Sequence, residues 1–405
     1  MDAMVNAAPP DLLSPEFARD PYPIYRTMRN DFPIHHDPRL GWIISRAADV
    51  REALTHEDYS TATYAAVREL VGRSILEMDG AEHGRHRRLV SPSFRGRPLA
   101  SYGEVITEAA DELLDELAAR PDPDLVRDYC ALLPIRVIMG IMDLPRQDYA
   151  MFQVWYRAAA DYVGNYTQDP DVAEAGLRAK RELDKYLQEV IDQRRAAPGD
   201  DLISSMCTAT INDATLTDRE ILDFCSLLLA AGGETTERGL ASTFRNLLDH
   251  PDQLDDVRAD PDLSLRAFAE SLRLNPPTHI LLRRLLATRE ISGVDVPAGA
   301  TMFCLIGAAN RDEDEFVDAE RFDLRRAEID VNTAFNAGSS HLSFGAGRHF
   351  CVGAMLARAE AAIGIPAVLR RFPVLRYRDG FVPVEEGMLT RAPRSLRVTL
   401  DPAPR

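Results

Sequence analysis

The 405-residue sequence predicts a mainly α-helical protein with small β-sheets, organised as one domain over residues 1–405. Helical periodicity dominates from residue 101 onwards, whereas strand-like alternation is confined to short segments. No shift in composition marks a linker between two domains. The hydrophobic fraction of 45% is that of an ordinary globular protein, so a core large enough to enclose a bulky ligand is feasible.

The N-terminal part is expected to hold few regular elements. The first forty residues are interrupted by proline, which predicts a surface arm leading into a short helix. The sequence GWIISR at 41–46 predicts a short strand, and AADVREAL at 47–54 predicts a helix after it. Residues 57–80 show no clean period. We therefore expect a long loop there, and loops of that length often carry function.

The longest predicted helix covers residues 217–250. Thr217 or Asp218 can cap its beginning, and Pro251 follows its end. A second helix, DLSLRAFAESLRL, is stopped by a Pro-Pro pair, and residues 283–306 alternate as strands do. A helix after Cys351 and two short strands complete the chain.

The long helix contains a defect at Gly232 and Gly233. Each glycine costs about 0.5–1 kcal/mol relative to alanine inside a helix, so a kink or an opened hydrogen bond is expected there. An acid and a hydroxyl, Glu234 and Thr235, follow directly. Such a pair could pass protons into a dry cavity, but close packing of a neighbouring helix would explain the glycines equally well.

Charge and cysteine usage exclude several classes of protein. The chain carries 47 basic and 64 acidic residues, a net charge of −17, which predicts a soluble protein that does not bind nucleic acid. It shows no secretory signal and no apolar run long enough to span a membrane. No two of its five cysteines have C-x-x-C spacing, which argues against a disulfide framework or a zinc site. A cytoplasmic location and no membrane partner are therefore predicted.

One cysteine has an unusual setting. In SFGAGRHFCVGAMLARAE, residues 343–360, Cys351 stands among three glycines, with Phe344 and His349 upstream and a helical run downstream. The residues alone allow either a buried thiol or a ligand. Basic residues stand in structured settings elsewhere: His83 and Arg87 are four apart, as on one helix face. Singly these would be surface charges, but together they would suit a ligand that carries carboxylates.

A second basic pair, Arg283 and Arg284, lies within the aliphatic sequence ILLRRLLAT. The sequence ESLR places Glu270 and Arg273 at the i, i+3 spacing of an intrahelical ion pair, a common arrangement that by itself says little.

Taken together, these segments resemble the cytochrome P-450 superfamily of haem-thiolate monooxygenases, in the order in which that family has them. The cysteine segment matches F-G-x-G-x-H-x-C-x-G, and AGGETT at 231–236 matches the family's oxygen-activating helix. Glu270 and Arg273 match the E-x-x-R pair, and AERF at 319–322 resembles P-E-R-F. AEHGRHRR resembles the segment that contacts the haem propionates. The soluble N-terminus is similar to that of bacterial members.

The resemblance implies the cytochrome P-450 fold, a helical bundle that encloses haem b (iron protoporphyrin IX) between the long central helix and the cysteine loop. Cys351 would be the axial ligand of the iron and the chain's metal ligand. The other implied cofactor-binding residues are His83, Arg87, Ala231, Gly232, Arg283, Phe344, His349 and Gly353. The resemblance also implies that Glu234 and Thr235 are catalytic, as the pair that delivers protons. Arg321 would complete a structural triad with Glu270 and Arg273.

The resemblance further implies an oxidoreductase that inserts one oxygen atom of O2 into a mid-sized, largely apolar small molecule, such as a polyketide or terpenoid of secondary metabolism. Because no flavin or iron–sulfur segment is present, electrons are expected from a separate ferredoxin and its NAD(P)H-linked reductase. Arg88, Arg348 and Arg358 would form a basic patch for it, or be scattered solvated arginines. The chain is expected to act as a monomer.

Family position also suggests a pocket. Its expected walls are the 57–80 loop, Leu228 with Ala231, residues 278–282 and Met388 with Leu389, and its expected polar contacts are Thr278, His279 and Glu237. Gly233 is expected to widen the groove beside Glu234. The alternatives are a peroxide-driven haem-thiolate peroxygenase, a haem-thiolate isomerase or dehydratase, and a non-catalytic haem sensor.

Overall fold

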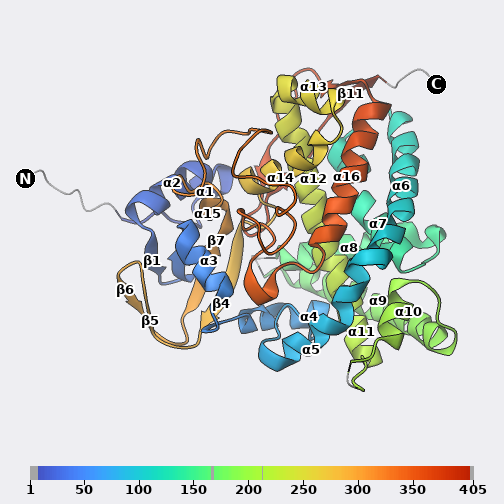
Figure 1. The fold of residues 1–405 in the computed structure, drawn as a ribbon, viewed down its shortest axis with the longest axis horizontal. Helices are drawn as coiled ribbons and strands as arrows, with labels where there is room; N and C mark the ends of the chain where they lie inside the picture. Colours follow the sequence, from blue (N-terminus) through green and yellow to red (C-terminus); the bar gives the residue numbers. More distant parts are fainter. Residues whose placement is uncertain (1–7, 166–167, 212, 402–405) are drawn as a thin grey trace, which may run out of the picture.

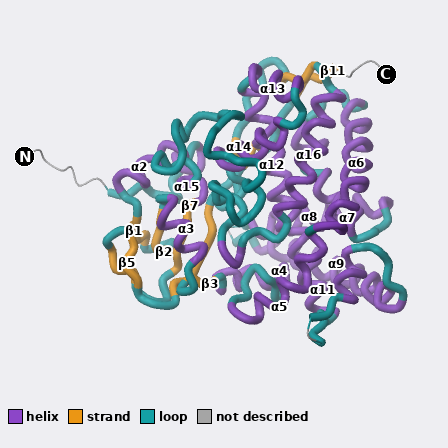
Figure 2. The backbone as a smooth tube through the Cα atoms, in the orientation of Figure 1, coloured by secondary structure: helices purple, strands orange, loops and turns teal. Residues whose placement is uncertain are grey.

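The computed structural model describes residues 8–165, 168–211 and 213–401, which are mostly helical, with the larger β-sheet at one side of the helices (Figure 1). Figure 2 shows the strands gathered next to the N-terminal helices, and the longer helices filling the other side. The α-helices have these bounds: α1 Pro15–Arg19, α2 Tyr22–Asp31, α3 Ala47–Thr55, α4 Arg68–Val71, α5 Gly80–Val90, α6 Gly96–Ala118, α7 Leu133–Ile141, α8 Tyr149–Val163, α9 Pro170–Ala196, α10 Leu202–Thr208, α11 Asp218–Leu227, α12 Gly233–Asp249, α13 Pro251–Ala259, α14 Leu263–Leu274, α15 Ile306–Ala309 and α16 Ala354–Arg371.

The strands form one mixed five-stranded sheet, in the order β1-β2-β7-β4-β3, and three small antiparallel pairs. In the large sheet only β2 and β7 pair in parallel. The strands predicted from the alternation at 283–306 therefore pair with strands from the first sixty residues. The bounds are β1 Ile34–Asp37, β2 Gly41–Ile44, β3 Tyr59–Ser60, β4 Ile280–Leu285, β5 Arg289–Ile291, β6 Val294–Val296, β7 Thr301–Leu305, β8 Val374–Tyr377, β9 Glu385–Glu386, β10 Ala392–Pro393 and β11 Val398–Asp401.

The expected surface arm is wrong, because the N-terminal segment is helical and packed. Phe17, Tyr25 and Met28 are each at most 2% exposed and belong to one core cluster with residues of β4 and β7. Ser14 caps α1 by accepting the N–H of Phe17, and the helix begins at the next residue, Pro15. Proline here starts helices rather than preventing them.

The predicted long loop at 57–80 contains two short helical pieces. A 3-10 helix, η1 at Ala62–Val67, leads into α4, and the backbone then turns at Gly72 with a φ of 69°. We call residues 62–78 the loop segment. It lies between β3 and α5, so it joins the sheet to the helices.

The central helix has the predicted cap and the predicted defect. Thr217 and Glu220 form a capping box at the start of α11, and α12 ends at Asp249, two residues before Pro251. Between the two helices lies a π-helical segment, η5 at Leu228–Gly232. A π segment leaves backbone groups out of the regular i to i−4 ladder, which is the opened hydrogen bonding expected beside adjacent glycines.

The groove expected beside Gly233 is not open. A Cβ atom at Gly233 would lie 2.7 Å from Cε2 of Tyr156, so the tyrosine ring of α8 fills that space. The phenol of Tyr156 also donates a hydrogen bond to Glu237 on α12. Gly233 therefore permits close helix packing, the other explanation that the sequence allowed.

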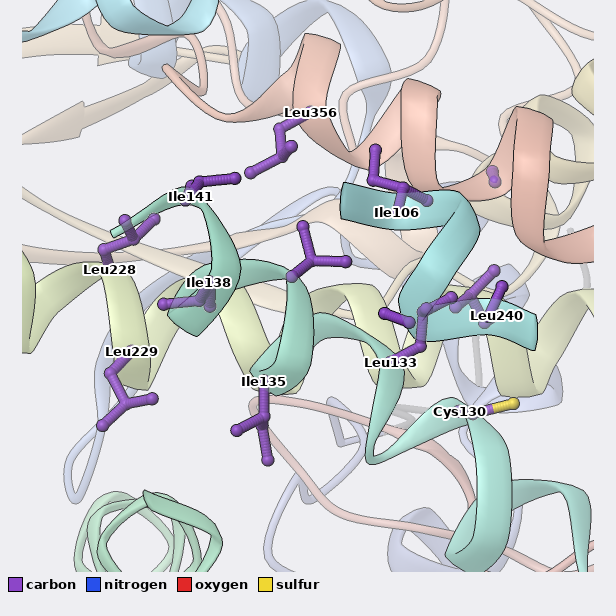
Figure 3. Packing of buried hydrophobic residues seen from close by; sticks show 14 of the residues in the cluster. Ile106, Cys130, Leu133, Ile135, Ile138, Ile141, Leu228, Leu229, Leu240 and Leu356 are labelled. Atoms are coloured by element: carbon purple, nitrogen blue, oxygen red, sulfur yellow. The ribbon is translucent and has the colours of Figure 1, made fainter. Parts of the chain in front are cut away.

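The main core forms where helices α6, α7, α12 and α16 meet. Figure 3 shows Ile141 of α7 between Leu228 of the central helix and Leu356 of α16, and Ile138 of α7 beside Leu228 and Leu229. These side chains are at most 8% exposed. The core therefore fixes the distance between the central helix and the helix that follows Cys351.

A buried charge network supports the segment before the cysteine loop. Arg273 donates to both carboxylate oxygens of Glu270 at 2.8 Å, and Arg326 donates to Glu270 Oε1 at 2.9 Å. The prediction that Arg321 is the third member is wrong, because the side chain of Arg321 is exposed. Its backbone carbonyl accepts a hydrogen bond from Arg273 at 3.1 Å. Arg326 takes the position because its side chain turns inward and is 4% exposed.

Replacing Arg326 by alanine should lower the free energy of unfolding by about 3–5 kcal/mol, because Glu270 would keep only one cationic partner in a buried site. The exposed Arg321→Ala variant is the matched control and should change it by less than about 0.5 kcal/mol. Urea unfolding followed by circular dichroism measures both. Equal destabilisation by the two variants would contradict the assignment.

Candidate functional site

A large cavity lies between the central helix, the loop segment and the cysteine loop. Its empty space is about 1460 Å³, counted out into the open mouth. Most of its wall is apolar. The main lining residues are Thr61, Tyr64, Ile75, Leu76, Arg87, Ile138, Phe224, Leu227, Leu228, Ala231, Gly232, Thr235, Thr236, Thr278, Leu281, Arg283, Phe344, His349, Cys351, Gly353 and Glu360.

Cys351 stands in this wall on a tight loop. Gly345 and Gly347 have φ values of 70° and 64°, a region that favours glycine, and the N–H of Cys351 donates to the carbonyl of Phe344 at 2.8 Å. Burial raises the pKa of the Cys351 thiol, while N–H groups of Gly353 and Ala354 and the nearby charge of Arg87 oppose the rise. The loop thus presents a sulfur to the cavity with donors prepared for a thiolate.

Two guanidinium groups face the same cavity. Arg283 is 4% exposed and donates to the carbonyl of Leu282 at 2.8 Å, whereas its neighbour Arg284 is exposed because successive residues of β4 point to opposite faces. Arg87 has no hydrogen-bond or ion-pair partner within the part of the chain that the structure describes. Burial lowers the pKa of Arg87, and the nearby Cys351 opposes this shift.

The rings of two histidines lie against each other at a tilt of 38°. The rings of His83 and His349 have centroids 4.2 Å apart, and Nε2 of His349 lies 3.2 Å from Oδ1 of Asp79. His83 is 4% exposed, and its Nε2 has no hydrogen-bond partner among the described residues. Burial lowers the pKa of His83 and, together with the neighbouring His83, lowers that of His349 to about 4. Both rings are therefore neutral donors at pH 7.

The residues at the end of the π segment and at the start of α12 point in different directions. Ala231, Gly232 and Thr235 line the cavity, and the hydroxyl of Thr235 donates to the carbonyl of Ala231 at 2.8 Å. Glu234 instead lines a second cavity, on the side of α1 and of Met388. There its carboxylate pairs with Arg238 at 2.7 Å and accepts from Thr390 at 2.9 Å. The acid and the hydroxyl are adjacent in sequence, but they face different cavities.

Comparison with known proteins decides the family. A family model described as cytochrome P450 matches residues 169–267 and 265–400. Pulcherriminic acid synthase of Bacillus subtilis is 34% identical over 396 residues, which are 97% of this chain and 98% of that protein. The chain belongs to the cytochrome P450 family. Cytochrome P450 monooxygenase PikC of Streptomyces venezuelae is 34% identical over 388 residues, covering 91% of this chain and 89% of PikC.

Solved structures agree with the P450 fold. Cytochrome CYP109E1 from Bacillus megaterium, in a complex with testosterone, superposes with a TM-score of 0.84 at 28% identity, covering 94% of this chain and 99% of that one. The predicted fold, a helical bundle with small sheets, is thereby confirmed. Like its family, this P450 is a monooxygenase that binds haem b, whose iron takes a cysteine thiolate. Among the described residues, no helix has both the length and the apolar character that a membrane span requires.

The residues that line the cavity match the chemical groups of haem b. A porphyrin with two carboxylates needs an apolar slot, a thiolate for the iron and cationic or N–H donors for the carboxylates. The slot contains Cys351, the unpaired Arg87 and the buried Arg283, and the unpartnered Nε2 of His83 lies beside it. The residues present therefore fit the group that the family binds.

Part of the expected pocket wall lies elsewhere. Thr278 and Leu281 line the cavity, but Met388 lines the second cavity with Glu234, and Leu389 belongs to the N-terminal core cluster. His279 is 1% exposed, and its Nδ1 lies 3.0 Å from the hydroxyl of Tyr25. Glu237 bonds to Tyr156 as described above. The polar contacts expected from His279 and Glu237 are therefore absent from the main cavity in the described residues.

Sequence reasoning missed two residues of this region, Thr236 and Glu360, and included a third, Tyr64, only as part of the 57–80 loop. Tyr64, in the loop segment, lines the cavity and accepts the N–H of Leu282 at 3.1 Å, and Thr236 faces the same space. Glu360 is 2% exposed, and its Oε2 has no partner among the described residues. A single acid in the otherwise apolar run AEAAIGI was the available signal for Glu360.

Stability should fall with rising pH because of Glu360. Burial raises the pKa of this carboxyl to about 8, against about 4.5 when unfolded, so folding favours the protonated form. Its contribution is complete below pH 4.5 and is lost as the pH rises to 8. Glu360→Gln should therefore gain stability over the wild type across this window, by several kcal/mol at most. Thermal unfolding from pH 5 to 8 measures the difference.

The exposed Glu104→Gln variant is the control for this measurement and should track the wild type at every pH. Parallel curves for the wild type and Glu360→Gln would show that Glu360 is ionised in the folded protein at neutral pH.

Proposed function

We propose that this P450 inserts one oxygen atom of O2 into a mid-sized, largely apolar small molecule, with electrons from a separate ferredoxin and its NAD(P)H-linked reductase. The observation that carries the proposal is the position of the Cys351 sulfur, in the wall of an apolar cavity that also receives the hydroxyl of Thr235. The haem, when bound, supplies the activation of O2, which a thiolate ligand favours. The protein orients the substrate and delivers protons.

In this proposal Cys351 holds the iron, and Phe344 and Gly353 flank the sulfur. The ring of Phe344 lies within 6.1 Å of the rings of Phe335, His341 and Phe350, which together screen the loop from water. His83, Arg87, Arg283 and His349 bind the haem carboxylates. Ala231 and Gly232 present backbone to the haem face, because small residues at the π segment allow a close approach.

In this proposal Thr235 and Glu234 manage protons from two different faces of the central helix. The hydroxyl of Thr235 is bonded to a carbonyl of its own helix and can rotate to donate into the cavity. Glu234 is held by Arg238 and Thr390 at the second cavity, and its proposed role is to relay protons from that side. A proton must then pass the opened backbone of the π segment or bound water to reach Thr235.

The substrate class follows from the wall. Ile75, Leu76, Ile138, Leu227 and Leu228 supply aliphatic surface, and a few hydroxyls, from Thr61, Tyr64 and Thr278, supply polar contacts. Such a wall selects by shape and area rather than by charge. Testosterone, which is bound in the related CYP109E1 structure, is a compact apolar molecule with few oxygens and so is of the kind that such a wall selects. We propose a polyketide- or terpenoid-like substrate.

Cys351→Ser should abolish the red-shifted Soret band that the reduced wild-type protein gives under carbon monoxide, because a serine hydroxyl is a poor iron ligand. The control Cys207→Ser changes a cysteine outside the cavity lining and should keep the band. A wild-type spectrum without this band would refute thiolate ligation. Turnover with hydrogen peroxide as efficient as with ferredoxin and O2 would favour the peroxygenase alternative.

The ferredoxin is proposed to dock where Arg88, Arg348 and Arg358 border the cysteine loop. Arg88 is exposed, with no partner among the described residues. Arg348 donates to the carbonyls of His56 and Tyr59 at 3.2 and 3.3 Å, and Arg358 lies over the ring of Phe335. Arg88 is therefore the best probe, because its removal breaks no contact.

Arg88→Glu should slow the first reduction of the haem by a ferredoxin about tenfold at low salt, through lost electrostatic attraction, and should leave substrate affinity unchanged. Arg376→Glu, on β8, reverses another exposed charge and serves as the control. Stopped-flow reduction under carbon monoxide measures the rate. Equal rates for wild type and Arg88→Glu would place the docking surface elsewhere.

A further inference from the structure

The loop segment is tied to the central helix through Asp223, a residue without a role so far. Asp223 lies on α11 and is 4% exposed. Its Oδ2 accepts the backbone N–H of Arg73 at 2.9 Å, and its Oδ1 lies 2.7 Å from Nη2 of Arg219. A buried carboxylate is costly unless it is paired and hydrogen-bonded. One of the two groups that compensate Asp223 is thus the backbone of the loop segment.

The fit at this contact is close. Gly72 has a φ of 69°, a conformation that favours glycine, and a Cβ atom there would lie 1.9 Å from Oδ1 of Asp223. The carboxylate therefore occupies the space that any side chain at position 72 would need. Glycine at this turn and aspartate on the helix form one complementary pair.

The turn joins three walls of the main cavity. Ile75 and Leu76, which follow it, line the cavity, as does Phe224, which follows Asp223 on the helix. The side chain of Arg73 pairs with Glu82 of α5 at 2.5 Å. Helix α5 also carries His83 and Arg87. A shift of the turn therefore moves substrate-facing side chains relative to the central helix.

Asp223 carries the polar connection between these parts. Within the described residues, no other hydrogen bond or ion pair connects residues 62–78 to α11. The pair between Arg68 and Glu77 is internal to the loop segment, and Tyr64 bonds to β4 instead. Loss of the Asp223 contact would remove this polar connection and leave the segment attached by the apolar packing of Leu70, Val71 and Ile75 and by the pair between Arg73 and Glu82.

We propose that Asp223 is a positioning residue that latches the loop segment over the cavity and so sets how fast small molecules enter and leave it. The proposal rests on the proposed function, since it takes the main cavity to be the site of haem and substrate. Segments that gate ligand sites are held by few contacts, and opening them governs exchange with solvent.

Two measurements on the ferric holoprotein test the latch. Stopped-flow absorbance follows the dissociation of 4-phenylimidazole, an apolar nitrogen ligand of haem iron, and amide hydrogen exchange follows the loop segment. Asp223→Leu removes the acceptor, Gly72→Ala forces a Cβ into the contact, and Asp223→Asn keeps an oxygen for the N–H of Arg73. Asp184→Asn is the matched control, because Asp184 pairs with Lys180 and Arg219 but not with the loop segment.

Asp223→Leu and Gly72→Ala should each raise the ligand dissociation rate and the amide exchange rate about tenfold or more. Asp223→Asn should raise them less than about threefold, and Asp184→Asn should change neither rate. Unchanged rates in both latch variants, or an equal rise in Asp184→Asn, would overturn the latch. If neither latch variant folds, the wild type decides, since fast exchange of the Arg73 amide would show that the bond to Asp223 is not formed. A missing thiolate band under carbon monoxide in the wild type would instead mean that the proposed function fails.

Discussion

The constraint on which the site depends is a sulfur that must be an anion inside an apolar cavity. Burial alone makes the Cys351 thiol harder to ionise. The N–H groups of Gly353 and Ala354 and the charge of Arg87 oppose this effect. These donors come from the backbone and from another helix, α5. The cysteine loop, the helix after it and α5 must therefore keep fixed relative positions for the chemistry to work.

The core meets this requirement by fixing helices rather than loops. Side chains of α7 fill the space between the π segment and α16, as Figure 3 shows, so the two helices on either side of the cavity share one packed interface. The charge network of Glu270, Arg273 and Arg326 holds the chain that leads to the cysteine loop. The substrate side, by contrast, depends on a segment with few polar anchors. The cofactor site is thus held by packed helices, whereas the wall formed by the loop segment is the part that the proposed latch would release.

The central helix separates two tasks that are adjacent in the sequence. Glu234 faces a cavity shared with α1 and Met388, while Thr235 faces the main cavity, because neighbouring residues of a helix point about 100° apart. Under the proposed function, Glu234 exchanges protons at the second cavity, so that the main cavity need not open to water. The π segment lies between the two sides, and its backbone groups are outside the regular helical ladder. The proposal thus assigns proton delivery and exclusion of water to two faces of one helix.

Local patterns sufficed for the central helix and for the residue types of the site, but not for the helices in the first forty residues and at 62–71. The capping box at Thr217, the glycine defect and the spacing around Cys351 are determined by residues close in sequence, so they could be predicted. The sequence could not predict which side chain turns inward, because this depends on partners distant in the chain. Arg326 rather than Arg321 pairs with Glu270, and Tyr156 fills the space beside Gly233. The contact of Gly72 with Asp223, 151 positions apart in sequence, exists only once the chain has folded. Tertiary packing decided these contacts, since burial and charge pairing act between segments that no local period connects.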